Sequence, residues 1–92
     1  MNKALLIRIT GLVQGVGYRA WTERAARERG LSGWVRNRRD GSVEALIAGE
    51  AQKVDEMLAY CWQGPLSSRV ERVEAAPATE PMQLGFRQLP TA

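Results

Sequence analysis

The sequence contains no histidine and a single cysteine, Cys61, and these two scarcities exclude several classes of enzyme. Without histidine the chain cannot build a Ser-His-Asp triad, a Cys-His pair or a histidine-ligated zinc site. One cysteine cannot form an internal disulfide or a thiolate metal cluster, which favours a reducing compartment. Any catalysis must therefore use arginine, lysine, carboxylates, amides, hydroxyls, the one thiol or backbone N–H groups.

Long hydrophobic runs are also missing. No apolar stretch approaches the roughly 20 residues that a membrane-spanning helix needs. The apolar start of the chain is interrupted at Arg8, which is unlike a signal peptide, so we expect a cytoplasmic protein without a membrane partner. The 92 residues, 45% hydrophobic and 25% charged, suit one domain over residues 1–92. The net charge of +3 favours anionic ligands without choosing among them.

The order of periodic segments predicts a ferredoxin-like α/β sandwich. Alternation of apolar and polar residues predicts strands, which cover residues 4–10, 33–38, 43–47 and, less cleanly, 69–76, with a short last strand at 82–86. Apolar residues at helical spacing predict helices over 18–29 and 49–62. Two helices can cover one face of an antiparallel sheet, in the order βαββαβ with an extra C-terminal strand.

The segment Gly11–Arg19, between the first predicted strand and helix, is the best candidate for chemistry. Three of its first seven residues are glycine, which lets backbone N–H groups turn toward one point. The start of the following helix adds its positive end, and Arg19 can bind phosphate oxygens through a bidentate fork. Most glycine-rich turns bind nothing, however, and this one lacks the Walker A and dinucleotide-binding spacings.

Two blocks of sequence resemble a known family. The loop sequence Val-Gln-Gly-Val-Gly-Tyr-Arg, ending at Arg19, resembles the signature of the acylphosphatases. Gly33–Asn37, followed by Asp40–Glu44 and Gly49, is similar to the second block of that family and stands in the proper order. The resemblance covers nearly the whole chain and implies a small, free-standing acylphosphatase whose last strand lies at an edge of the sheet.

The resemblance also implies a role for each site residue. Acylphosphatases hydrolyse the mixed anhydride of a carboxylic acid and phosphate. The amides of residues 14–19 and the Arg19 guanidinium would hold the phosphoryl group, and Asn37 would position the attacking water. The implied phosphate-binding residues are Gln14, Gly15, Val16, Gly17, Tyr18 and Arg19. Tyr18 stands where the family more often has phenylalanine, and we expect a core aromatic with its hydroxyl at the surface.

This chemistry suits a site without histidine. An acyl phosphate releases a carboxylate, whose conjugate acid has a pKa of about 4, so the group leaves as an anion at neutral pH without a general acid. A loose transition state asks little of the nucleophile, which leaves positioning and charge stabilisation as the main tasks. We expect no cofactor, no metal, a monomer, and weak or no activity on phosphate monoesters.

Two other functions remain open at this point. A basic ferredoxin-like domain with three tryptophans could bind RNA, although residues 5, 7, 9, 43, 45 and 47 include none of the aromatics that RNA-binding sheets expose. A non-catalytic phosphate-binding domain would keep Arg19 but would not need Asn37. The sequence does not identify the physiological acyl phosphate. We expect Cys61 to be a half-buried core thiol and not a nucleophile, Trp62 to pack, and Glu44 to be a surface charge.

Overall fold

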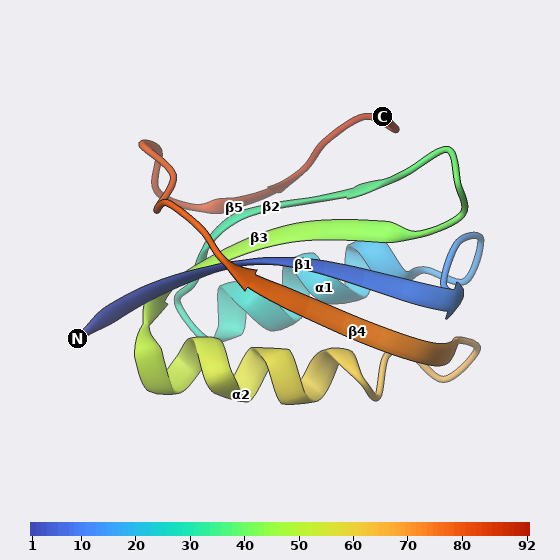
Figure 1. Cartoon of the computed structure of the whole chain (residues 1–92), viewed down its shortest axis with the longest axis horizontal. Coiled ribbons are helices and arrows are strands. Elements are labelled where there is room, and N and C mark those ends of the chain that lie inside the picture. The colour runs from blue at the N-terminus through green and yellow to red at the C-terminus, as the bar shows by residue number, and fades with distance from the viewer.

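The computed structural model describes residues 1–92 and has the predicted order of helices and strands, with the last strand displaced along the chain. The strands are β1 (Asn2–Leu12), β2 (Ser32–Asn37), β3 (Val43–Glu50), β4 (Arg69–Pro77) and β5 (Phe86–Gln88), and the helices are α1 (Tyr18–Glu28) and α2 (Ala51–Cys61). Both helices lie on the same side of one sheet, as Figure 1 shows. Neither helix is long and apolar enough to cross a membrane.

The sheet has the strand order β4-β1-β3-β2-β5 and is mixed, whereas the sequence predicted an antiparallel sheet. The pairs β1–β3, β1–β4 and β2–β3 are antiparallel, but β5 runs parallel to β2. The cause is where β4 ends. It finishes at the end of the sheet where β2 begins, so the chain that crosses from β4 can only start β5 in the direction of β2 (Figure 1). The predicted edge position of this strand is confirmed.

The hydrophobic core fills the space between the sheet and the two helices. Leu5, Ile7 and Ile9 alternate along β1 as predicted and are all buried. The other fully buried side chains of the core include Val35, Val43, Ile47, Val54 and Met57. On the opposite face of β2, the Arg36 guanidinium lies 4.7 Å from the centre of the Trp34 ring, which confirms the predicted alternation of this strand.

Strand β4 owes its weak sequence pattern to a bulge. Thr10 of β1 pairs with Arg72, and the next residue of β1 pairs with Val70, so that Glu71 has no partner. Because one residue is inserted, Val70 and Val73 both pack against the core although they are three positions apart. A strict period of two therefore fails here.

The last strand lies further along the chain than the sequence predicted. Met82 and Leu84 are almost fully exposed and belong to the connection, while β5 covers Phe86–Gln88. The chain turns at Gly85, whose φ of 93° suits glycine, and only Phe86 of the predicted apolar set enters the core. The alternation at 82–86 thus reflected chance rather than a buried face.

The ends of α2 also differ from the prediction. Gly49 and Glu50 complete β3, and the helix begins at Ala51. Cys61 is fully buried rather than half-buried, and Trp62, directly after the helix, is 51% exposed and does not pack into the core.

We expect Ile47→Ala to lower the free energy of unfolding by about 2–5 kcal/mol, because a fully buried side chain leaves a cavity when it is truncated. Urea unfolding followed by tryptophan fluorescence measures this loss. Leu6→Ala is the matched control, since Leu6 lies on the outer face of the sheet and is 38% exposed. Equal losses in the two variants would contradict the assignment of the core to the helix-covered face.

Candidate active site

The fold brings the two predicted blocks to the same end of the sheet. Strands β1 and β2 run in the same direction on either side of β3, so the loop after β1 and the turn after β2 lie at one end. Figure 1 shows both segments at the right of the molecule, with the C-terminal residues running toward them. Residues separated along the chain are thereby placed around one site.

A pocket of about 140 Å³ lies between these segments. It is lined by Val13, Gly15, Gly17, Tyr18, Arg19, Ala20, Asn37 and Gln88. The volume is below the roughly 300–1,000 Å³ of pockets that take drug-sized ligands, so the space suits a small group. The pocket joins Arg19 and Asn37, whereas Gln14 and Val16 are not part of its lining.

Gln88 is a lining residue that the sequence did not reveal. It follows the predicted last strand, and it reaches the pocket only because β5 pairs with β2 in a register that sets Gln88 beside Val35. No local sequence pattern carries this information.

The backbone of the glycine-rich loop keeps its N–H groups unpaired. None of the N–H groups from Val13 to Ala20 donates a hydrogen bond within the protein, and the first helical bond runs from Trp21 N to Gly17 O at 3.0 Å. Gly15 and Gly17 have φ values of 74° and 82°, a left-handed conformation that other residues rarely adopt. The loop amides and the positive end of α1 are therefore open to an anion.

The charges at the start of α1 also favour an anionic ligand. No acidic residue lies in the first turn, and no side chain caps the helix at Gly17. Arg19 takes part in none of the ion pairs of the structure, so its guanidinium is available to a ligand.

The Gln14 side chain fixes the shape of the loop. Its Nε2 donates to the carbonyl oxygens of Arg38 and Ser42, at 2.7 and 2.8 Å. The loop is thereby tied to the turn between β2 and β3, next to Asn37. The side chain points away from the anion-binding space, so any contact of Gln14 with an anion would be through its backbone.

Asn37 is the last residue of β2, and its side chain is incompletely satisfied. Its Oδ1 is the only buried side-chain nitrogen or oxygen without a hydrogen-bond partner. An unpaired buried acceptor costs about 1–3 kcal/mol, so its retention calls for an explanation. The backbone of the residue is held, because Ala92 N donates to Asn37 O at 3.0 Å.

The Tyr18 hydroxyl lies in the core and not at the surface, so that part of the prediction is wrong. Tyr18 is 1% exposed, and its hydroxyl donates to the Cys61 carbonyl oxygen at 2.7 Å. This carbonyl ends α2, and the residue four positions later is Pro65, which has no N–H to offer it. Tyr18 therefore replaces the missing helical bond.

Burial also makes the two groups at this contact inert. Loss of hydration raises the pKa of the Tyr18 hydroxyl far above its usual value, so it remains a donor. Burial raises the pKa of the Cys61 thiol to about 12, although the neighbouring Tyr18 hydroxyl and the positive charge of Arg29 oppose this shift. The thiol stays protonated at neutral pH, which agrees with the prediction that Cys61 is not a nucleophile.

The basic run of Arg36, Arg38 and Arg39, at the end of β2 and just after it, is partly neutralised. Glu44 accepts from Arg36 at 2.7 Å and lies 3.4 Å from an Arg38 nitrogen. Glu44 is therefore a paired carboxylate and not the free surface charge that we expected, and Arg39 is the member of the run that stays exposed.

Fold and site together define an α+β sandwich with an anion-binding loop at one end of its sheet. The family model described as Acylphosphatase matches residues 5–88. An acylphosphatase of Rhodospirillum rubrum is 52% identical over 89 residues, which cover 97% of this chain and 98% of that protein.

Two solved structures agree with this family. The acylphosphatase from Coxiella burnetii has a TM-score of 0.92 and 28% identity, and covers 96% of this chain and 93% of its own. The acylphosphatase from Bacillus subtilis has a TM-score of 0.89 and 30% identity, with 97% and 99% coverage. The chain therefore belongs to the acylphosphatase family. This confirms the predicted ferredoxin-like fold and the predicted enzyme class, an acylphosphatase.

We expect Tyr18→Phe to lower the free energy of unfolding by about 1–3 kcal/mol, because the Cys61 carbonyl loses its only donor. Turnover should stay near that of the parent protein, since the hydroxyl lies outside the site. Denaturant unfolding and a turnover assay measure the two effects. Tyr60→Phe is the control, because the Tyr60 hydroxyl makes no hydrogen bond within the protein and its ring stacks on Trp21. A large loss of turnover in Tyr18→Phe would contradict this assignment.

Proposed function

We propose that this acylphosphatase holds the phosphoryl group of an acyl phosphate on the backbone amides of residues 14–19 and on the Arg19 guanidinium, while Asn37 positions the attacking water. The observation that carries the proposal is the unbroken run of unpaired N–H groups from Val13 to Ala20 beside an unpaired arginine. Family membership supports a small acyl phosphate as the substrate.

Phosphate binding draws on three sources of positive charge that converge on one small space. The loop amides surround the anion, the start of α1 adds its partial charge, and Arg19 supplies two parallel N–H donors. Gln14 holds the loop in this shape before the substrate arrives, so little reorganisation is needed on binding.

In the proposed reaction a water oxygen forms a bond to phosphorus as the bond from phosphorus to the acyl oxygen breaks. The electron pair of the broken bond leaves with the carboxylate, and the water gives up its proton to the phosphate product or to solvent. Asn37 can orient this water through the amide group whose oxygen has no protein partner. Because the leaving group is a weak base, the step needs neither a general acid nor a Lewis acid.

We further propose that residues 1–92 act as a single domain and as a monomer. The family model spans residues 5–88, and the one hydrophobic core draws on both helices and on β1, β2, β3 and β5. Every element of the site lies within this one chain.

We expect Arg19→Ala to reduce kcat/KM for benzoyl phosphate by at least about 100-fold, the usual cost of losing one preorganised donor to transition-state charge. Phosphate release in the presence of a chelator measures this, and inorganic phosphate should inhibit the parent protein competitively. Arg24→Ala is the control, since Arg24 is exposed on the same helix and makes no ion pair. Turnover by the parent protein that requires added metal would refute the mechanism.

We expect Asn37→Ala to abolish turnover of benzoyl phosphate and to leave the affinity for inorganic phosphate nearly unchanged. The reason is that Asn37 is assigned to the water and not to the phosphoryl group. Isothermal titration with phosphate measures binding independently of turnover. Asn2→Ala is the control, because Asn2 is an exposed residue at the start of β1. Loss of phosphate binding in Asn37→Ala would assign the residue to the anion instead.

A further inference from the structure

A carboxylate lies close to the phosphate anchor without pairing with it. Glu23 follows Arg19 by four positions on α1, a spacing that puts two side chains next to each other on one face of a helix. Such a carboxylate can form an ion pair with the guanidinium and compete with an anionic substrate. No ion pair between Arg19 and Glu23 is formed, although the Glu23 side chain is only 22% exposed.

Both oxygens of Glu23 are instead occupied by other donors. Arg27 Nη2 lies 2.9 Å from Oε2, and Gln88 Nε2 donates to Oε1 at 2.9 Å. Arg27 is one turn further along α1, and a glutamate pairs better with a basic residue four positions after it than with one four positions before it. The helix geometry alone therefore favours Arg27 over Arg19 as the ion-pair partner of Glu23. Gln88 adds a second donor, which bonds to the other carboxylate oxygen.

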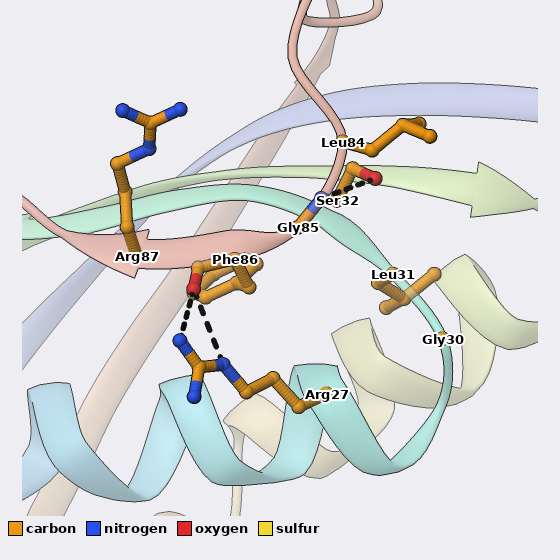
Figure 2. Close-up of a pocket in the computed structure, with 8 residues that line it drawn as sticks. All are labelled: Arg27, Gly30, Leu31, Ser32, Leu84, Gly85, Phe86 and Arg87. Atoms are coloured by element: carbon orange, nitrogen blue, oxygen red, sulfur yellow. Dashed lines mark hydrogen bonds between the residues drawn. The ribbon is translucent and has the colours of Figure 1, made fainter.

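The two donors are themselves held by β5. Arg27 donates from Nε and Nη2 to the Phe86 carbonyl oxygen, at 3.2 and 2.9 Å. Figure 2 shows this fork reaching from α1 to the start of β5. Gln88, two residues further along, is the last residue of β5 and helps to line the pocket that contains Arg19.

We propose that Gln88 and Arg27 are positioning residues that hold the Glu23 carboxylate away from Arg19, so that the guanidinium stays free for the phosphoryl group. The inference rests on the proposed role of Arg19 as the phosphate anchor. Gln88 is the residue at which this can be tested, because its side chain bonds only to Glu23 and it is exposed, whereas Arg27 also fastens α1 to β5.

The first test is Gln88→Leu, which removes the donor and keeps a side chain of similar size. Glu23 then gains freedom to pair with Arg19. The inhibition constant for inorganic phosphate and the KM for benzoyl phosphate should each rise about two- to fivefold, the size that a partly exposed ion pair allows, with kcat unchanged. Gln88→Ala should give the same result. Unchanged constants in both variants, or a fall in kcat alone, would overturn the inference.

The second test repeats the substitution in a Glu23→Gln background, where no competing carboxylate remains. There Gln88→Leu should have no effect on either constant, because no carboxylate at position 23 remains to pair with Arg19. If the effect of Gln88→Leu persists in that background, Gln88 contacts the substrate directly and the inference is wrong. Melting temperatures of all variants show whether a change in binding reflects a change in folding.

Arg19→Ala in the same series separates this inference from the proposed function. If Arg19→Ala leaves phosphate inhibition intact, Arg19 is not the anchor, and the proposed function fails together with this inference. If Arg19→Ala abolishes inhibition while Gln88→Leu changes nothing, the anchor stands and only the role of Gln88 fails.

Discussion

The site depends on a loop whose N–H groups have no acceptors in the protein. Unpaired donors from Val13 to Ala20 gain nothing from the fold itself, so other contacts must hold the loop in its open shape. Gln14 holds it on one side by two hydrogen bonds to the turn after β2. Tyr18 holds it on the other side, because its ring is packed in the core and its hydroxyl is fastened to the end of α2. The loop is thus fixed at both ends while its donors stay open.

The side chains around the loop likewise leave Arg19 without a partner in the protein. In a protein with 13 basic and 10 acidic side chains, many arginines find a carboxylate. Arg36 and Arg38 share Glu44, and Arg27 pairs with Glu23. These pairs keep the nearby carboxylates occupied. Arg19 stays without a partner, and the positive charge of the site is not cancelled from within.

Much of this arrangement could be predicted from the sequence, and the rest could not for identifiable reasons. Local periodicity located both helices and four strands, because burial of one face leaves a mark on neighbouring residues. It gave only a weak pattern for β4, where a bulge changes the period, and it misplaced β5, whose short pairing with β2 is set by the path of the chain across the sheet. The hydroxyl of Tyr18 was misplaced because its acceptor is 43 positions away.

Some residues of the candidate site could be predicted from the sequence, and others could be found only in the structure. Arg19 and Asn37 are predicted as site residues because the motifs that contain them resemble a family, and the fold brings both to one pocket. Gln88 was missed, since its place at the pocket follows from the register of β5 and not from any motif. The side-chain role of Gln14 was also missed, because its two acceptors are backbone carbonyls that no sequence pattern marks.

The bulge in β4 has a consequence beyond the packing of two valines. This strand is one border of the sheet, and a regular border offers a neighbouring chain a continuous row of N–H and C=O groups on which to add a strand. The unpaired Glu71 bends that row, and the charged residues Arg69, Arg72 and Glu74 flank it. The opposite border, β5, is only three residues long. Both borders are therefore poor templates for the addition of a strand from a neighbouring chain.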